Sequence, residues 1–203
     1  MRTSSGPKSV RKHLNRFAIA NILAGAGLLA VACPAEAEIV YTPTNITIGS
    51  NGSYKLDLNN DGVTDFTLSS HFGESKQPTC LYIHASVQEK AASGNDVEGH
   101  PPAELVTGDP IGSNQAFYGG TGTLVSYSLC GGKKNSEGKW EPNGENGYLG
   151  LSFQINGETY YGWAQLKITV VTNPPLPPAF AATLTGYAYE SVPGMPINAG
   201  QTK

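Results

Sequence analysis

The sequence lacks a recognisable catalytic constellation. The histidines His71, His84 and His100, which follow the N-terminal leader, are not spaced as metal ligands, and no serine lies in a Gly-x-Ser-x-Gly nucleophile elbow. These absences disfavour an enzyme. A glycosidase-like pair of carboxylates, for example Glu104 with Glu141, would act through proximity in space and would leave no sequence signature. A glycan-active enzyme therefore remains the less favoured alternative.

Long apolar runs are also absent, apart from residues 17–32. Five basic residues precede this run, and the small-x-small sequence Ala35-Glu36-Ala37 follows it. The run is too short for a comfortable membrane span. Residues 1–37 are therefore predicted to be a signal peptide, cleaved after Ala37. Acylation of Cys33 is the rival interpretation, but the three residues before it lack the usual leucine.

Positive charge is scarce in the mature chain. The leader carries a net charge of +4, so its removal takes the chain from −3 to −7 and leaves 166 residues. This acidity argues against nucleic acid and anionic membrane surfaces as partners. The length predicts one domain over residues 38–203 with a single core. The signal peptide predicts that this domain is secreted, periplasmic or at the cell surface, and the mature chain is expected to have no membrane span.

Cysteine is rare as well, with three in the chain. Cys33 leaves with the predicted leader, which leaves Cys80 and Cys130 as an even pair. In an oxidising compartment a disulfide between them is expected, and two buried thiols are the alternative.

The most specific feature that is present is the segment 57–65. Oxygen-bearing side chains recur at alternate positions, a glycine follows them at Gly62, and one residue can offer only its carbonyl. That spacing suits a hard cation with six to eight oxygen ligands. The predicted ligands of a structural Ca²⁺ are Asp57, Asn59, Asp61, Val63 and Asp65. The alternative is a solvated Asn/Asp/Gly turn.

The flanks of this loop decide its type. The twelfth position is Leu68, where an EF-hand requires a bidentate glutamate, and residues 53–56 and 66–69 alternate as strands do. In this form the loop resembles the short calcium loops of FG-GAP and VCBS repeats. A propeller needs several copies, and this chain has one.

Alternation and turn residues predict an all-β fold. Asn156-Gly157 between the runs 148–155 and 158–170 predicts a hairpin in which Phe153 faces Tyr160. Further strands are predicted at 38–48, an edge strand containing Pro43, and at 80–84, 123–130 and 182–190. Residues 88–122 are predicted to be a surface excursion, 131–147 a polar loop and 192–203 an irregular cap. The expected architecture is a two-sheet antiparallel sandwich, jelly-roll or lectin-like.

Aromatic residues offer a possible ligand site. Tyr161 and Trp163 project to one side of one strand, and Tyr187 and Tyr189 to one side of another. On neighbouring strands they could form a strip that binds sugar rings, which predicts a carbohydrate-binding module as the alternative function. The competing interpretation is that these rings pack beneath a second sheet or the excursion.

The C-terminal blocks at 148–153, 160–164, 184–190 and 193–201 resemble the end of a group of exported bacterial proteins of uncharacterised function. Many of those carry a PEP-CTERM sorting tail, whereas this chain stops at Lys203 without an apolar anchor. The resemblance implies no activity. The sequence as a whole predicts a calcium-stabilised, exported β-sandwich with a structural or surface-interaction role, its partner a polysaccharide or another cell-surface component.

Overall fold

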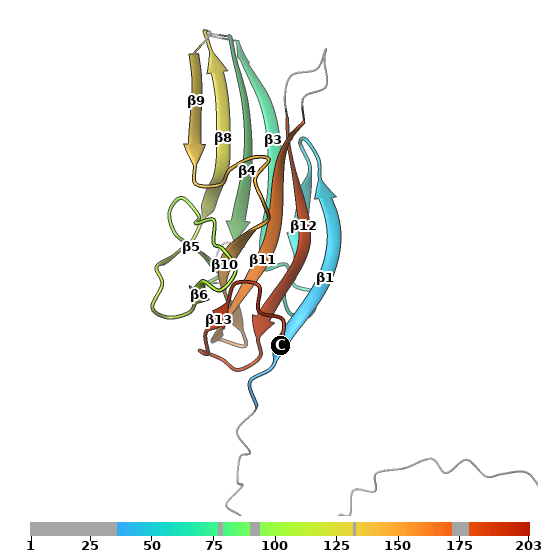
Figure 1. The fold of residues 1–203 in the computed structure, drawn as a ribbon, viewed down its shortest axis with the longest axis vertical. Coiled ribbons are helices and arrows are strands. Elements are labelled where there is room, and N and C mark those ends of the chain that lie inside the picture. The colour runs from blue at the N-terminus through green and yellow to red at the C-terminus, as the bar shows by residue number, and fades with distance from the viewer. Residues whose placement is uncertain (1–35, 77–78, 90–93, 132, 172–178) are drawn as a thin grey trace, which may run out of the picture. The chain divides into compact units, whose positions relative to one another are not determined.

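The computed structural model describes residues 36–203, except 77–78, 90–93, 132 and 172–178. Apart from its last two residues, the predicted signal peptide lies outside this part, and so does Cys33. The described residues form strands joined by turns, and they include no helix (Figure 1). Accordingly, no helix within the described ranges is long and apolar enough to cross a membrane.

The strands divide into long ones that build the sheets and short ones of two or three residues in the connections. In chain order they are β1 (Ile39–Ile48), β2 (Ser53–Leu56), β3 (Phe66–Lys76), β4 (Thr79–Glu89), β5 (Asp96–Glu98), β6 (Pro110–Ile111), β7 (Phe117–Tyr118), β8 (Thr121–Cys130), β9 (Lys133–Gly138), β10 (Gly147–Ile155), β11 (Glu158–Val171), β12 (Ala179–Glu190) and β13 (Ile197–Asn198).

Two antiparallel sheets pack as a sandwich, which confirms the predicted class. Sheet A has the order β1-β12-β11-β10-β5-β7 and sheet B the order β2-β3-β4-β8-β9. Buried residues of both sheets form one apolar core between them, including Phe66 and Leu68 from sheet B and Leu151, Phe153 and Leu184 from sheet A. The alternation of apolar and polar residues along these strands supplies that inner layer.

The hairpin at Asn156-Gly157 forms with the predicted register, in which Phe153 pairs with Tyr160 and Leu151 with Gly162. Both turn residues have positive φ, 53° and 85°, as a type I′ turn requires. β1 is likewise an edge strand, and its register with β12 shifts between Pro43 and Ile46. Proline cannot donate to the ladder, so it is accommodated at this irregularity.

The predicted loop at 131–147 is wrong in part, because residues 133–138 form β9 at the edge of sheet B. This strand, Lys-Lys-Asn-Ser-Glu-Gly, has no apolar alternation, because its described side chains are exposed and main-chain pairing with β8 holds it in place. Hydrophobic periodicity reports burial on one face, so it cannot detect such a strand.

Two segments, the excursion and the C-terminal residues 192–203, form a cover on the outer face of sheet A. Within the excursion, β5 and β7 extend sheet A beyond β10, and β6 pairs with β13 from the C-terminal segment. Figure 1 shows these pieces gathered at the same end of the sandwich as the C-terminus. They enclose a second apolar cluster that includes Leu105, Ile111, Tyr161, Trp163 and Ile197. Sheet A is therefore buried on both faces where the cover lies.

Candidate functional site

The segment 57–65 connects β2 to β3 and closes around its own backbone. The main-chain N–H of Asp61 donates to Asp57 Oδ1 (3.2 Å) and to Asn59 Oδ1 (3.3 Å). Gly62 N donates to Asp57 Oδ2 (2.8 Å), and Val63 N donates to Asp61 Oδ1 (2.7 Å). The left-handed φ of 57° at Asn60 and 88° at Gly62 makes this tight path possible. Three oxygen-bearing side chains thus gather at one side of the loop.

Asp65 behaves differently from the other two aspartates. It is buried, Oδ2 accepts from Leu58 N (2.8 Å), and Oδ1 accepts from Asn95 Nδ2 (3.3 Å). Burial raises the pKa of this carboxyl, and the negative charges of Asp57 and Asp61 raise it further. Asp65 therefore fastens the loop to the core and, through Asn95, to the start of the excursion.

The donor set fits a hard cation in kind. Asp57, Asn59 and Asp61 all offer oxygen, and each oxygen that accepts a main-chain N–H keeps a further lone pair. Across the described ranges, however, no three His, Cys, Asp or Glu side chains are arranged together to hold a metal ion. In this loop the Asp65 carboxylate turns inward and accepts from Leu58 and Asn95. A cation here would use the Asp57, Asn59 and Asp61 side, completed by main-chain carbonyl and water.

The predicted aromatic strip does not form. β11 and β12 are neighbours, but Trp163 pairs with Ala188 and Tyr189 pairs with Gly162. Directly paired residues share a face, so Tyr161 and Trp163 lie on the opposite face of sheet A from Tyr187 and Tyr189. The two strands are joined by a long proline-rich connection, and the sequence therefore could not fix their register as Asn156-Gly157 fixed that of β10 and β11.

The first aromatic pair lies beneath the cover. Trp163 is 2% exposed, and its Nε1 donates to Gln201 O in the C-terminal segment (3.1 Å). Tyr148 meets the Trp163 ring edge-on, with centroids 5.3 Å apart, and the Phe117 and Tyr161 ring centroids lie 5.6 Å apart.

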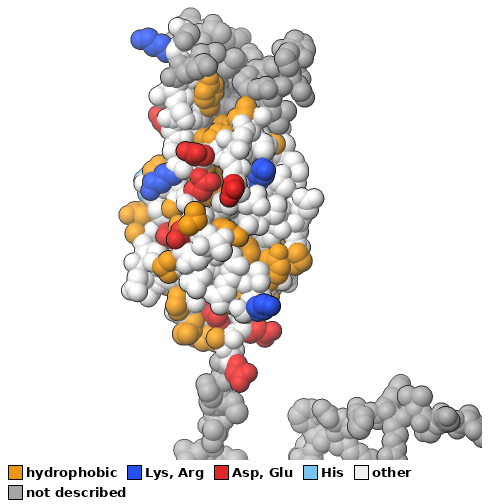
Figure 2. All heavy atoms as spheres, viewed as in Figure 1, with side chains coloured by type: hydrophobic (Ala, Val, Ile, Leu, Met, Phe, Trp, Pro, Cys, Tyr) orange, Lys and Arg blue, Asp and Glu red, His pale blue; other side chains and the backbone are white. Residues whose placement is uncertain are grey.

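Figure 2 shows the apolar side chains on the face in view as separate patches, without one continuous apolar area.

The second pair faces the sandwich core. Tyr187 is buried, and the half-buried Tyr189 meets Phe153 edge-on with ring centroids 5.4 Å apart. Burial raises the pKa of the Tyr189 hydroxyl, and the nearby Tyr160 raises it further. Both pairs therefore serve as packing residues, and neither presents two exposed coplanar rings.

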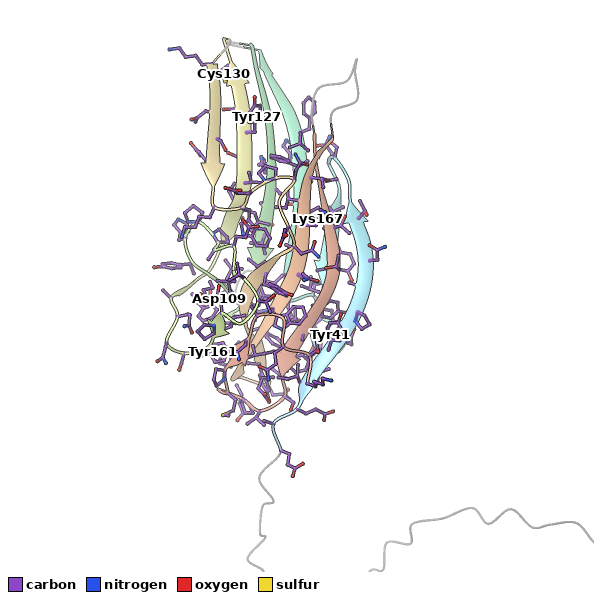
Figure 3. The ribbon with its side chains drawn as sticks, viewed as in Figure 1. Tyr41, Asp109, Tyr127, Cys130, Tyr161 and Lys167 are labelled. Carbon is purple, nitrogen blue, oxygen red and sulfur yellow. The ribbon has the colours of Figure 1, made fainter. Side chains whose placement is uncertain are left out.

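Cys80 and Cys130 are directly opposite one another on β4 and β8. Paired residues of an antiparallel ladder have Cα atoms about 4.5 or 5.5 Å apart, and disulfides span about 4.4–6.8 Å between Cα atoms. The side chain of Cys80 lies outside the described residues, so the disulfide stays a prediction. Figure 3 shows Cys130 at one end of the sandwich, away from Tyr161 and Asp109.

Glu104 and Glu141, the pair considered for glycan hydrolysis, meet through the Glu104 carboxylate and the main-chain N–H of Glu141. Glu104 Oε2 accepts from Glu141 N (3.0 Å), while the Glu141 side chain is exposed. This hydrogen bond ties the excursion to the segment before β10.

Sequence reasoning missed a carboxylate in the cover. Glu98 Oε2 is buried and has no hydrogen-bond partner among the described residues. It lies over Gly150, where an added Cβ would stand 2.6 Å from this oxygen. Burial raises the pKa of Glu98 to about 7, and Asp109 contributes to the rise. In the sequence, Gly150 opposite Trp163 indicated that another group packs closely against the hairpin. It did not indicate that this group is the Glu98 carboxylate.

Sequence reasoning also separated two histidines that the fold brings together. His71 on β3 pairs with His84 on β4, and their ring centroids are 5.2 Å apart. No Asn-Gly turn marks this hairpin, so its register was not predicted.

Comparison with known proteins found no match, whether to a family model, to a curated protein or to a solved structure. The resemblances to calcium-loop repeats and to exported bacterial proteins therefore remain predictions.

Proposed function

We propose that this chain is an exported β-sandwich protein that Ca²⁺ stabilises and that has a structural or surface-interaction role. The loop at 57–65 carries the proposal, because the Asp57 and Asn59 side-chain oxygens share one main-chain donor and Asp61 lies beside them. Three aspartates within nine residues repel one another, and a cation relieves that repulsion. The raised pKa of Asp65 has this repulsion among its causes.

In this proposal Asp57, Asn59 and Asp61 hold the ion with the Val63 carbonyl and water. Asp65 does not bind the ion directly, and its carboxylate adds negative charge nearby. Calcium contributes no reaction chemistry here. It fixes the β2–β3 connection, to which Asn95 fastens the beginning of the cover through Asp65. Bound calcium would therefore stabilise both the edge of sheet B and the attachment of the excursion.

The structural role is favoured over carbohydrate binding by the aromatic rings. Exposed coplanar rings would support a sugar platform, whereas Tyr161, Trp163 and Tyr187 are each at most 8% exposed. The disulfide between Cys80 and Cys130 belongs to the same proposal, since export exposes the pair to oxidising conditions.

Calcium titration tests the proposal. We expect the melting temperature of the mature protein to rise from chelator to millimolar calcium, and a 100-fold excess over Kd gives about 2.7 kcal/mol. Asp61→Asn should weaken the effect, because it removes charge that compensates the ion's dehydration. The exposed Glu145 provides the control, and Glu145→Gln should respond as the wild type does. A melting temperature that calcium leaves unchanged would refute the proposal.

A further inference from the structure

The outer face of sheet B carries a polar row that crosses four strands. His71 on β3 pairs with His84 on β4, His84 pairs with Ser126 on β8, and Ser126 pairs with Glu137 on β9. Since directly paired residues point to the same face, these four side chains lie side by side. The core side of the same strands holds Leu68, Ala85 and Val125 instead.

The two imidazoles at one end of this row have a centroid separation that is compatible with a shared metal ion. Their centroids are 5.2 Å apart and their planes are inclined by 37°. A Zn–N bond of about 2.05 Å places the ring centroid about 3.2 Å from the metal, and a tetrahedral angle then separates two centroids by about 5.2 Å. The pair lies on rigid, hydrogen-bonded strands, so little ordering is needed to bring the rings together.

A groove adjoins the pair on the side of β8 and β9. It has a volume of about 300 Å³ and is lined by His84, Ser86, Thr123, Ser126, Ser128 and Glu137, among others. Within the described ranges no third His, Cys, Asp or Glu side chain joins the histidines as a ligand set. The remaining coordination positions therefore fall to water or to a small oxygen ligand in the groove.

We propose that His71 and His84 form a site for a transition-metal dication of the Cu²⁺, Ni²⁺ or Zn²⁺ class, open to solvent on its groove side. Imidazole nitrogen suits these ions and does not suit Ca²⁺. The site is separate from the loop at 57–65 in both ligands and metal preference, so either proposal can fail without the other.

The test is calorimetric titration of the tag-free mature protein with Cu²⁺, Ni²⁺ and Zn²⁺ salts, each alone, in saturating Ca²⁺. We expect one ion per chain, with Cu²⁺ bound most tightly, as the order of divalent affinities requires. His71→Ala and His84→Ala should each weaken binding by at least about tenfold. His100→Ala is the matched control and should bind normally, since His100 lies in the excursion against Tyr118.

A second measurement separates lost ligation from lost folding. Electron paramagnetic resonance of the Cu²⁺ complex should show two coordinated nitrogens in the wild type and fewer in the conservative variant His84→Gln. Each variant's thermal unfolding is measured without metal, and an unchanged transition assigns the lost affinity to the removed ligand. The proposal is overturned if the wild type binds none of the three ions, or if the double variant His71→Ala/His84→Ala binds them as the wild type does.

Discussion

The outer faces of the two sheets differ although their strands alternate in similar ways. On sheet A the outward residues include Tyr161 and Trp163, and the cover buries them. On sheet B the outward residues include His71, Ser126 and Glu137, which are at least partly exposed. The outer face of sheet A, which is aromatic, is thus covered by other segments of the chain. The outer face of sheet B, which carries hydroxyl and imidazole groups, is in contact with solvent.

This difference shows what alternation encodes. A period of two separates the faces of a strand, but it does not say whether the second face meets solvent or another segment. The composition of the outward residues carries that information. On β11 they are large and aromatic, which predicts a cover, and the excursion and the C-terminal segment supply it.

Breaking the contact between sheet A and its cover should cost the most stability. Trp163→Ala should lower the free energy of unfolding by about 3–5 kcal/mol, because it removes a buried ring and the donor to Gln201 O. Ser126→Ala on the outer face of sheet B should change it by less than about 0.5 kcal/mol. Urea denaturation of both variants measures the contrast. Equal, small losses would show that the cover leaves sheet A as exposed as sheet B.

The predicted disulfide between β4 and β8 should stabilise sheet B. Cys80 and Cys130 pair across β4 and β8, and a disulfide there would close a loop of about 50 residues, worth roughly 2–4 kcal/mol. Alkylation of the native exported protein followed by mass measurement, with and without reduction, shows the state of the pair. We expect two labels only after reduction, together with a lower melting temperature in reductant. Two labels before reduction would refute the disulfide.

The predictable part of the fold rested on local chemistry. Asn156-Gly157 specifies a two-residue turn, and that turn fixes every pair from Ile155–Glu158 to Leu149–Ala164. Pro43 likewise indicated an edge position. The register of β11 with β12 depends on contacts formed after a long connection. The sequence therefore could not predict that Trp163 and Tyr189 lie on opposite faces of sheet A.

The same limit applied to the candidate sites. The spacing of Asp57, Asn59 and Asp61 is local, and the sequence located that loop and its flanking strands. The inward turn of Asp65 depends on Asn95, thirty residues away. The His71–His84 pair and the burial of Glu98 depend on strand register and on the cover, which no local motif records.

The carboxyl of Glu98 in the cover should make a smaller, pH-dependent contribution to stability. The pKa of Glu98 rises from 4.5 to about 7 because the cover desolvates its carboxyl, with Asp109 adding repulsion. Below about pH 4.5 the folded and unfolded chains are both protonated at this site, and Glu98 then carries no charge penalty. Between about pH 4.5 and 7 the folded chain retains a proton that the unfolded chain has lost, so this group makes stability fall as pH rises.

Glu98→Gln should therefore stabilise the protein at pH 8 and leave it nearly unchanged at pH 4. The difference between the two pKa values corresponds to about 3 kcal/mol. Because the residue is partly exposed, solvent screening reduces the expected gain to about 1–2 kcal/mol. Urea denaturation of the variant and the wild type at pH 4, 6 and 8 isolates this group, since the other carboxyls are common to both chains. Glu145→Gln, at an exposed position outside the cover, should show no such trend. A Glu98→Gln gain that stays constant from pH 4 to pH 8 would mean that the cover does not desolvate this carboxylate, and the distinction between the two outer faces would then rest on the aromatic residues alone.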